Sequence, residues 1–91
     1  MKIKEGYVIN KLGGGYVVVT VGDASRDFNG LIRLNNAGAF LWENIRDGLN
    51  TKEKLIRAMM DYYDDLDEEV ARKDLDEFLE EVKFAIEDDE N

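Results

Sequence analysis

The chain has 91 residues and a net charge of −9, enough for one small domain with one core. It contains no Cys and no His, which excludes disulfides, a thiol nucleophile, cysteine-ligated zinc and the commonest general base. No apolar run reaches the roughly 20 residues of a membrane span, and the N-terminus lacks the apolar core of a secretory signal. These properties predict a cytoplasmic protein.

The first part of the chain predicts a β-hairpin. Residues 7–12 and 16–21 are rich in β-branched and aromatic side chains, and Gly13, Gly14 and Gly15 lie between them. Apolar residues occupy both alternating faces of the second run, so both faces are expected to be partly covered. A polar loop is predicted over residues 22–30, with Phe28 fixing it to the core.

A third strand is predicted at Leu31–Leu34, followed at once by a helix over about residues 36–47. Asn35 and Asn36 favour the start of that helix, because an asparagine side chain accepts a hydrogen bond from a free helical N–H. Gly48 suits its C-terminal left-handed position. A short strand between a loop and a helix is expected at a sheet edge, where unpaired backbone groups can capture an extended peptide.

Two more helices are predicted after residue 50. Residues 50–53 resemble a capping box that begins at Asn50 and contains Glu53, and Asp65 or Asp67 is expected to cap the last helix. The core-facing residues of the first of these helices are Leu55, Met59, Tyr62 and Tyr63. Those of the second are Ala71, Leu75, Phe78, Leu79, Val82 and Ile86. No proline or repeat interrupts the chain, so residues 1–91 are expected to form a single domain with an acidic tail over about residues 87–91.

The charge is unevenly distributed along the chain. Residues 61–91 carry 15 of the 21 acidic residues and only three bases, which gives −12, whereas residues 1–60 carry +3. A solvated helix face with an acidic tail is the simplest interpretation, and an interaction surface is the alternative. The acidic residues between Asp61 and Glu69 lack the order of a calcium-binding loop, and no metal site, cofactor or catalytic residue is predicted.

Strands followed by three helices are also typical of winged-helix proteins, in which the last helix reads DNA. Neutralising phosphates requires Lys and Arg, and the acidic last helix would repel DNA. A winged-helix DNA-binding transcriptional regulator is therefore the alternative hypothesis. An enzyme that uses paired carboxylates is a third and weaker one.

Short motifs in a characteristic order resemble the PqqD-like family, the precursor-peptide recognition elements of coenzyme PQQ synthesis and other peptide-modification pathways. These motifs are Glu5-Gly6-Tyr7-Val8, Tyr16-Val17-Val18-Val19, Phe28-Asn29-Gly30-Leu31-Ile32-Arg33-Leu34-Asn35 and Gly38-Ala39-Phe40-Leu41-Trp42. The most specific part joins Leu34, Asn35, Gly38, Leu41 and Trp42. The resemblance covers nearly the whole chain, from about Lys2 to Ile86.

The resemblance implies an α+β, winged-helix-like fold, with a three-stranded antiparallel sheet followed by a three-helix bundle. It implies a non-catalytic chaperone or adaptor without cofactor or metal. Such a protein binds the leader of a ribosomal precursor peptide by strand addition and presents it to a modifying enzyme, often a radical S-adenosylmethionine enzyme. Neither nucleic acid nor a membrane is expected as a partner, and a monomer or a strand-swapped dimer is expected.

The resemblance also implies two sets of peptide-binding residues. The binding strand is Leu31, Ile32, Arg33 and Leu34. The facing helix supplies Arg72, Lys73, Asp76, Leu79 and Lys83. Because they are the bases of an otherwise acidic helix, Arg72, Lys73 or Lys83 is expected to contact a carboxylate of the peptide, while Trp42 is expected to pack in the core.

Overall fold

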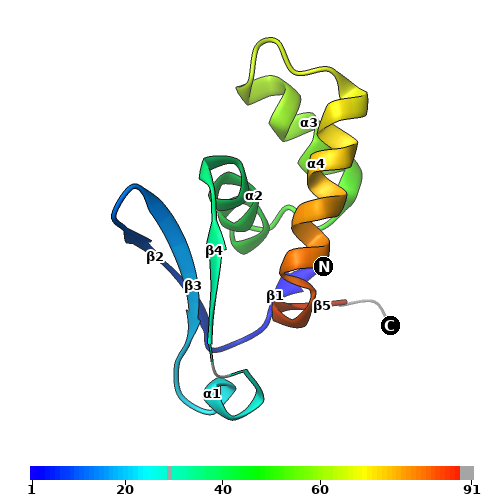
Figure 1. Cartoon of the computed structure of the whole chain (residues 1–91). Helices are drawn as coiled ribbons and strands as arrows, with labels where there is room; N and C mark the ends of the chain where they lie inside the picture. The colour runs from blue at the N-terminus through cyan, green and yellow to red at the C-terminus, as the bar shows by residue number, and fades with distance from the viewer. Residues whose placement is uncertain (29, 89–91) are drawn as a thin grey trace.

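A three-stranded antiparallel sheet, followed by helices, forms the framework of the computed structural model, which describes residues 1–28 and 30–88 (Figure 1). The strands are β1 (Lys2–Ile3), β2 (Tyr7–Leu12), β3 (Gly15–Thr20), β4 (Leu31–Leu34) and β5 (Ile86–Glu87). The α-helices are α1 (Ala24–Asp27), α2 (Asn36–Arg46), α3 (Lys52–Tyr62) and α4 (Glu68–Glu81), and a 3₁₀ turn, η1, spans Lys83–Ala85. The winged-helix-like fold expected from the sequence is confirmed.

The predicted hairpin is present, with β3 in the centre of the sheet order β2–β3–β4. Gly13 and Gly14 alone form the turn, and Gly13 adopts φ 61°, a left-handed conformation that glycine reaches without steric cost. Both faces of β3 are covered at its middle, because Val17 is 5% exposed and Val18 is 0% exposed. The central strand is therefore well buried, whereas most of β2 is exposed.

The stretch of residues 22–30, predicted to be a loop, contains the short helix α1 in its described part. Four residues are too few for hydrophobic periodicity to reveal a helix in the sequence. Phe28 anchors this connection as predicted: its ring stacks on Phe84 with centroids 4.4 Å apart. The hydroxyl of Thr20 also donates to the carbonyl oxygen of Phe28 at 2.9 Å. The connection is thus tied both to the sheet and to the C-terminal part of the chain.

Helix α2 begins where the sequence predicts. The Asn35 side chain accepts a hydrogen bond from the backbone N–H of Gly38 at 2.8 Å, which satisfies one of the free donors of the first turn. Gly48, just beyond the helix, has φ 118°. The helix buries Leu41 and Trp42, each only 1% exposed, so the core position expected for Trp42 is confirmed.

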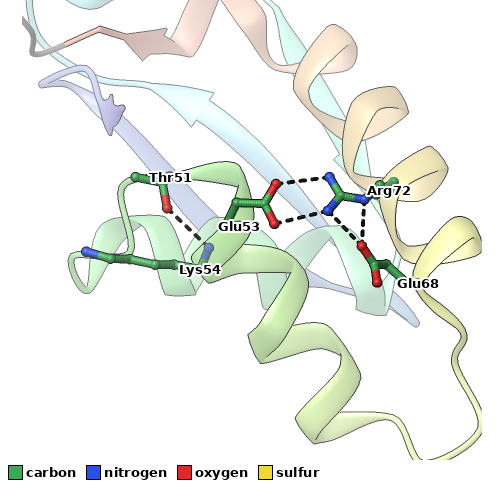
Figure 2. Close-up of polar contacts among 5 residues, drawn as sticks. All are labelled: Thr51, Glu53, Lys54, Glu68 and Arg72. Carbon is green, nitrogen blue, oxygen red and sulfur yellow. Dashed lines mark hydrogen bonds and ion pairs between the residues drawn. The ribbon is translucent and has the colours of Figure 1, made fainter.

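Helix α3 is capped one residue later than predicted, at Thr51 instead of Asn50. Its N-cap is Thr51, whose side-chain oxygen accepts from the N–H of Lys54, and Glu53 makes contacts with α4 instead (Figure 2). Leu55 and Met59 are buried as predicted. The predicted core position of Tyr62 is wrong, since this side chain is 66% exposed at the C-terminal end of the helix.

Helix α4 is capped by Asp67, which accepts from the N–H of Val70 at 3.0 Å. Ala71, Leu75 and Phe78 form its buried stripe. Ile86, expected on this helix, lies instead in β5, where it pairs with Ile3 of β1 in a second, two-stranded sheet. Glu87, expected in the acidic tail, also belongs to β5, and residues 89–91 of that tail lie outside the described ranges. None of the helices in the described ranges is long and apolar enough to span a bilayer.

Candidate functional site

Strand β4 pairs with β3 on one side, and no strand within residues 1–28 and 30–88 pairs with its other side. The register shows which of its backbone groups point outward. Val21 donates its N–H to the carbonyl of Gly6 at 2.8 Å, so that pair is hydrogen-bonded, and such pairs alternate along an antiparallel ladder. Val19 and Val17 lie two and four residues before Val21 in the sequence. Their backbone N–H and C=O groups therefore also point toward β2.

The residues between them, Tyr16 and Val18, direct their backbone groups toward β4. Their partners there are Leu34 and Ile32, respectively. Ile32 and Leu34 thus use their N–H and C=O groups within the sheet. Leu31 and Arg33, by alternation, direct theirs to the free edge. The edge offers these two residues' donors and acceptors to another strand.

The side chains of β4 alternate between the two faces of the sheet. Leu34 is 5% exposed and packs in the core, and Ile32 is half-buried against it. Leu31, which is 49% exposed, and Arg33 lie on the opposite, outer face. An added strand would therefore meet an apolar inner row and an exposed outer row.

A hollow of about 140 Å³ lies between α4 and the junction of β4 with α2, and we call it the edge groove. Its lining residues are Asn35, Ala37, Gly38, Leu41, Asp74, Glu77, Phe78 and Glu81. Gly38 permits the close approach of α2 to β4, since a Cβ atom there would lie 3.3 Å from Cβ and Cδ2 of Leu34. Helix α4 forms one wall of this groove and α2 forms its floor.

The α4 wall of the edge groove is acidic. Asp74, Glu77 and Glu81 recur at spacings of three and four residues, which places them on one face of the helix. None of the three makes an ion pair with any residue in the described ranges. No group of three or more carboxylates in those ranges is arranged to hold a metal ion. The sequence prediction had not selected these three acids, although their spacing around Phe78 was a usable signal.

Arg72, predicted to contact peptide, is engaged with two carboxylates on the α3 side of α4 (Figure 2). Its guanidinium donates to both oxygens of Glu53 at 3.0 and 3.1 Å and to Glu68 at 2.7 Å. The hydrogen bond and the charge of Arg72 hold the pKa of the Glu53 carboxyl below its ordinary value, and the same contacts raise the pKa of Arg72. This network joins α3 to α4.

The other predicted residues of α4 are dispersed. Asp76 pairs with Lys52 of α3 at 3.1 Å, and Lys83 pairs with Glu80 at 2.9 Å. Leu79 is half-buried against the core. Lys73 is exposed and makes no ion pair with a described residue, so it remains available to a ligand. None of these predicted residues lines the edge groove, whose helical residues come from the neighbouring flank.

Two further hollows follow the edge groove beyond Leu34. The first, the bridging hollow, has about 390 Å³ and is lined by Asn35, Asn36, Ala37, Met59, Tyr63, Leu66 and Asp74. The second, the aromatic groove, has about 630 Å³ and is lined by Lys11, Gly13, Gly14, Tyr16, Asn36, Ala39, Phe40, Glu43, Tyr62 and Tyr63.

Comparison with known proteins supports one family. A solved structure described as TbiB1 in complex with the TbiA(beta) leader peptide has the same fold, with a TM-score of 0.75, 20% sequence identity and coverage of 100% of both chains. No curated protein matches the sequence. Residues 8–83 match the sequence family described as Coenzyme PQQ synthesis protein D, a span that contains β4, α4 and all of the hairpin except its first residue. The chain therefore belongs to the PqqD family.

Proposed function

We propose that this chain is a non-catalytic adaptor that binds the leader segment of a ribosomally made precursor peptide and presents it to a modifying enzyme. The leader adds as an antiparallel strand to the free edge of β4. The modifying enzyme, of which a radical S-adenosylmethionine enzyme is one class, then acts on the segment that follows the leader. Membership of the PqqD family and the fold shared with a leader-bound protein support this proposal.

The observation that carries the proposal is the combination of a free strand edge and a second wall. Leu31 and Arg33 offer outward backbone groups, which supply affinity without special side chains. The edge groove lies at the Leu34 end of the strand, where Ala37 and the largely buried Leu41 and Phe78 make part of its lining apolar. A chain without His or Cys has all the groups that such binding requires.

The charge of the groove defines the peptide further. Asp74, Glu77 and Glu81 face the groove unpaired within the described ranges, while Arg72 is already engaged. The leader therefore carries Lys or Arg at positions that lie over α4. An exposed charge pair contributes only about 0–1 kcal/mol, so these contacts select among peptides more than they create affinity. Lys73 remains the cation of α4 that could meet a carboxylate of the peptide.

Selection from a randomised 20-residue peptide display library on the immobilised protein tests the proposal and does not require the sequence of the leader. Synthetic copies of the enriched peptides are titrated into ¹⁵N-labelled protein. The backbone amides of Leu31 and Arg33 should shift and exchange with solvent more slowly, while those of β2 stay unchanged. Peptides that perturb only other surfaces would overturn strand addition to β4.

The adaptor role needs a separate measurement. A fusion of an enriched peptide to a substrate segment is incubated with a candidate modifying enzyme, with and without this protein. Turnover should rise when the protein is added and should stay low with a variant that no longer binds the peptide. Equal turnover under saturating binding would leave peptide binding intact and remove the adaptor role.

A further inference from the structure

The aromatic groove holds a cluster of rings, of which Phe40 packs against the core and Tyr62 extends the cluster into solvent. Phe40 stacks on Tyr62 with ring centroids 4.7 Å apart, and Tyr63 meets both rings edge-on at 5.8 and 4.9 Å. Tyr62 is nevertheless 66% exposed. An exposed ring that is held in place by stacking loses little conformational entropy on binding, which is why aromatic residues are enriched in interfaces.

The aromatic groove is continuous with the edge groove. The edge groove and the bridging hollow share Asn35, Ala37 and Asp74, and the bridging hollow and the aromatic groove share Asn36 and Tyr63. The concave surface therefore runs from α4 across the N-terminal turn of α2 to the tip of the β2–β3 hairpin. A peptide that leaves the Leu34 end of β4 meets this surface next.

Strand direction determines which part of a peptide reaches it. Strand β4 runs toward Leu34, so an antiparallel strand begins at Leu34 and ends at Leu31. The residues of the peptide that precede the paired strand consequently emerge beside the bridging hollow. The residues that follow the strand, including the segment to be modified, emerge at the opposite end near α1 (Figure 1).

We propose that the aromatic groove binds the stretch of the same peptide that precedes the paired strand, and that it selects an aromatic or large apolar residue there. This inference rests on the proposed function. Lys11 and Glu43 flank the rings and leave polar positions for the neighbouring residues of the peptide. The binding footprint is thus longer than the β4 edge and extends away from the site of modification.

The test uses peptides enriched on the wild-type protein whose binding is lost in the variant Arg33→Pro. Deleting the residues before the paired segment should weaken binding to the wild type by roughly 3- to 10-fold, the scale of one aromatic contact. Tyr62→Ala should weaken binding of the full peptide equally and abolish the effect of the deletion. Tyr62→Phe should restore both the affinity for the full peptide and the effect of the deletion. Met60→Ala changes an exposed residue of the same helix outside the aromatic groove and should behave as the wild type.

A nitroxide label on either end of the peptide tests the direction. A label at the N-terminus should broaden the amides of Gly13 and Gly14, and a label at the C-terminus should broaden those of α1. The reverse pattern, or full-length binding that is unchanged in Tyr62→Ala, would overturn the inference while leaving strand addition intact. If no enriched peptide depended on the amide of Arg33, the proposed function itself would fail, together with the inference built on it.

Discussion

The two edges of the three-stranded sheet differ in what lies beside them. Strand β2 is longer than β4 and mostly exposed, and by the same alternation its residues Tyr7, Ile9 and Lys11 direct backbone groups outward. Strand β4 has two outward residues, but its end adjoins α2 and the acidic wall of α4. A free edge supplies hydrogen bonds, whereas specificity requires a second surface that reads side chains. The comparison therefore favours the shorter edge as the site of the proposed peptide binding.

The sharpest way to break this comparison is to remove one outward donor from each edge. Arg33→Pro deletes an N–H of β4 that points away from β3, so the three-stranded sheet should persist. The added strand of the peptide would lose one hydrogen bond, and its carbonyl at that position would be left unpaired. We expect a loss of about 2 kcal/mol or more, roughly 30-fold in affinity, by titration calorimetry.

Arg33→Ala is the matched control, since it removes the side chain and keeps the donor, and it should retain most of the affinity. Ile9→Pro makes the equivalent change on β2 and should leave binding unchanged at an equal folded fraction, measured by circular dichroism. Loss of binding in Ile9→Pro alone would move the site to the other edge.

Gly38→Val should perturb the β4 side of the molecule and not the hairpin. A Cβ atom at Gly38 already falls 3.3 Å from Leu34, so the larger side chain must displace α2 from β4. We expect the free energy of unfolding to fall by about 1–2 kcal/mol in urea titrations, with a parallel loss of peptide affinity. Gly14→Val, where no atom lies within 4 Å, is the control and should cost less. Equal destabilisation by the two variants would contradict the close packing at Gly38.

Neutralising the carboxylates of the acidic wall tests whether their charge contributes to peptide affinity at the β4 edge. The triple variant Asp74→Asn, Glu77→Gln, Glu81→Gln should weaken a basic peptide by up to about tenfold and flatten the dependence of affinity on salt. Asp64→Asn, Asp65→Asn, Glu69→Gln changes the net charge equally on exposed acids outside the edge groove, and it should have little effect. Identical losses in both variants would mean that total charge, and not the wall, attracts the peptide.

The smallest effect is expected from Arg72→Met. Because Arg72 joins α3 to α4, its replacement should lower the melting temperature by a few degrees at most and leave peptide affinity unchanged. A loss of peptide affinity would show instead that Arg72 contacts the peptide. Because the folded-state pKa of Glu53 lies below its ordinary value of 4.5, the stability it contributes is present above that value. The contribution is lost as the pH falls through the folded-state pKa. The stability difference between Arg72→Met and the wild type should therefore shrink in acid, as thermal melts over a pH series would reveal.

Local sequence signals predicted most of the fold. Asn35 and Asp67 cap helices because their side chains accept from free N–H groups only a few residues away, and the Gly13–Gly14 turn is equally local. The pairing of Ile3 with Ile86 was not predictable, since two-residue strands carry no period and the partners lie at opposite ends of the sequence. The exposure of Tyr62 was also missed, because helical spacing places it near the buried Met59 without revealing where the neighbouring elements end.

The candidate site was predictable to a lesser extent. The position of β4 between a connection and a helix indicated an edge, and the family resemblance indicated its use. The outward direction of Leu31 and Arg33 depends on the register with β3, which a sequence does not specify residue by residue. The α4 residues named from the resemblance included Arg72, whose partner Glu53 comes from another helix. The sequence shows which residues of α4 are charged. Which of them form ion pairs depends on the packing of α3 on α4 and could not be predicted.

The pairing of β1 with β5 has a consequence for protein engineering. Lys2 and Glu87 are opposite each other in this antiparallel pair, so their Cα atoms lie only about 4.5–5.5 Å apart. A unit whose first and last strands run side by side can be inserted into a surface loop of another protein while barely separating the two ends of that loop. The β4 edge lies in a different sheet and would stay accessible in such an insertion. Residues 2–87 are therefore a compact unit for insertion into an enzyme, with which the proposed peptide-binding edge would be transferred.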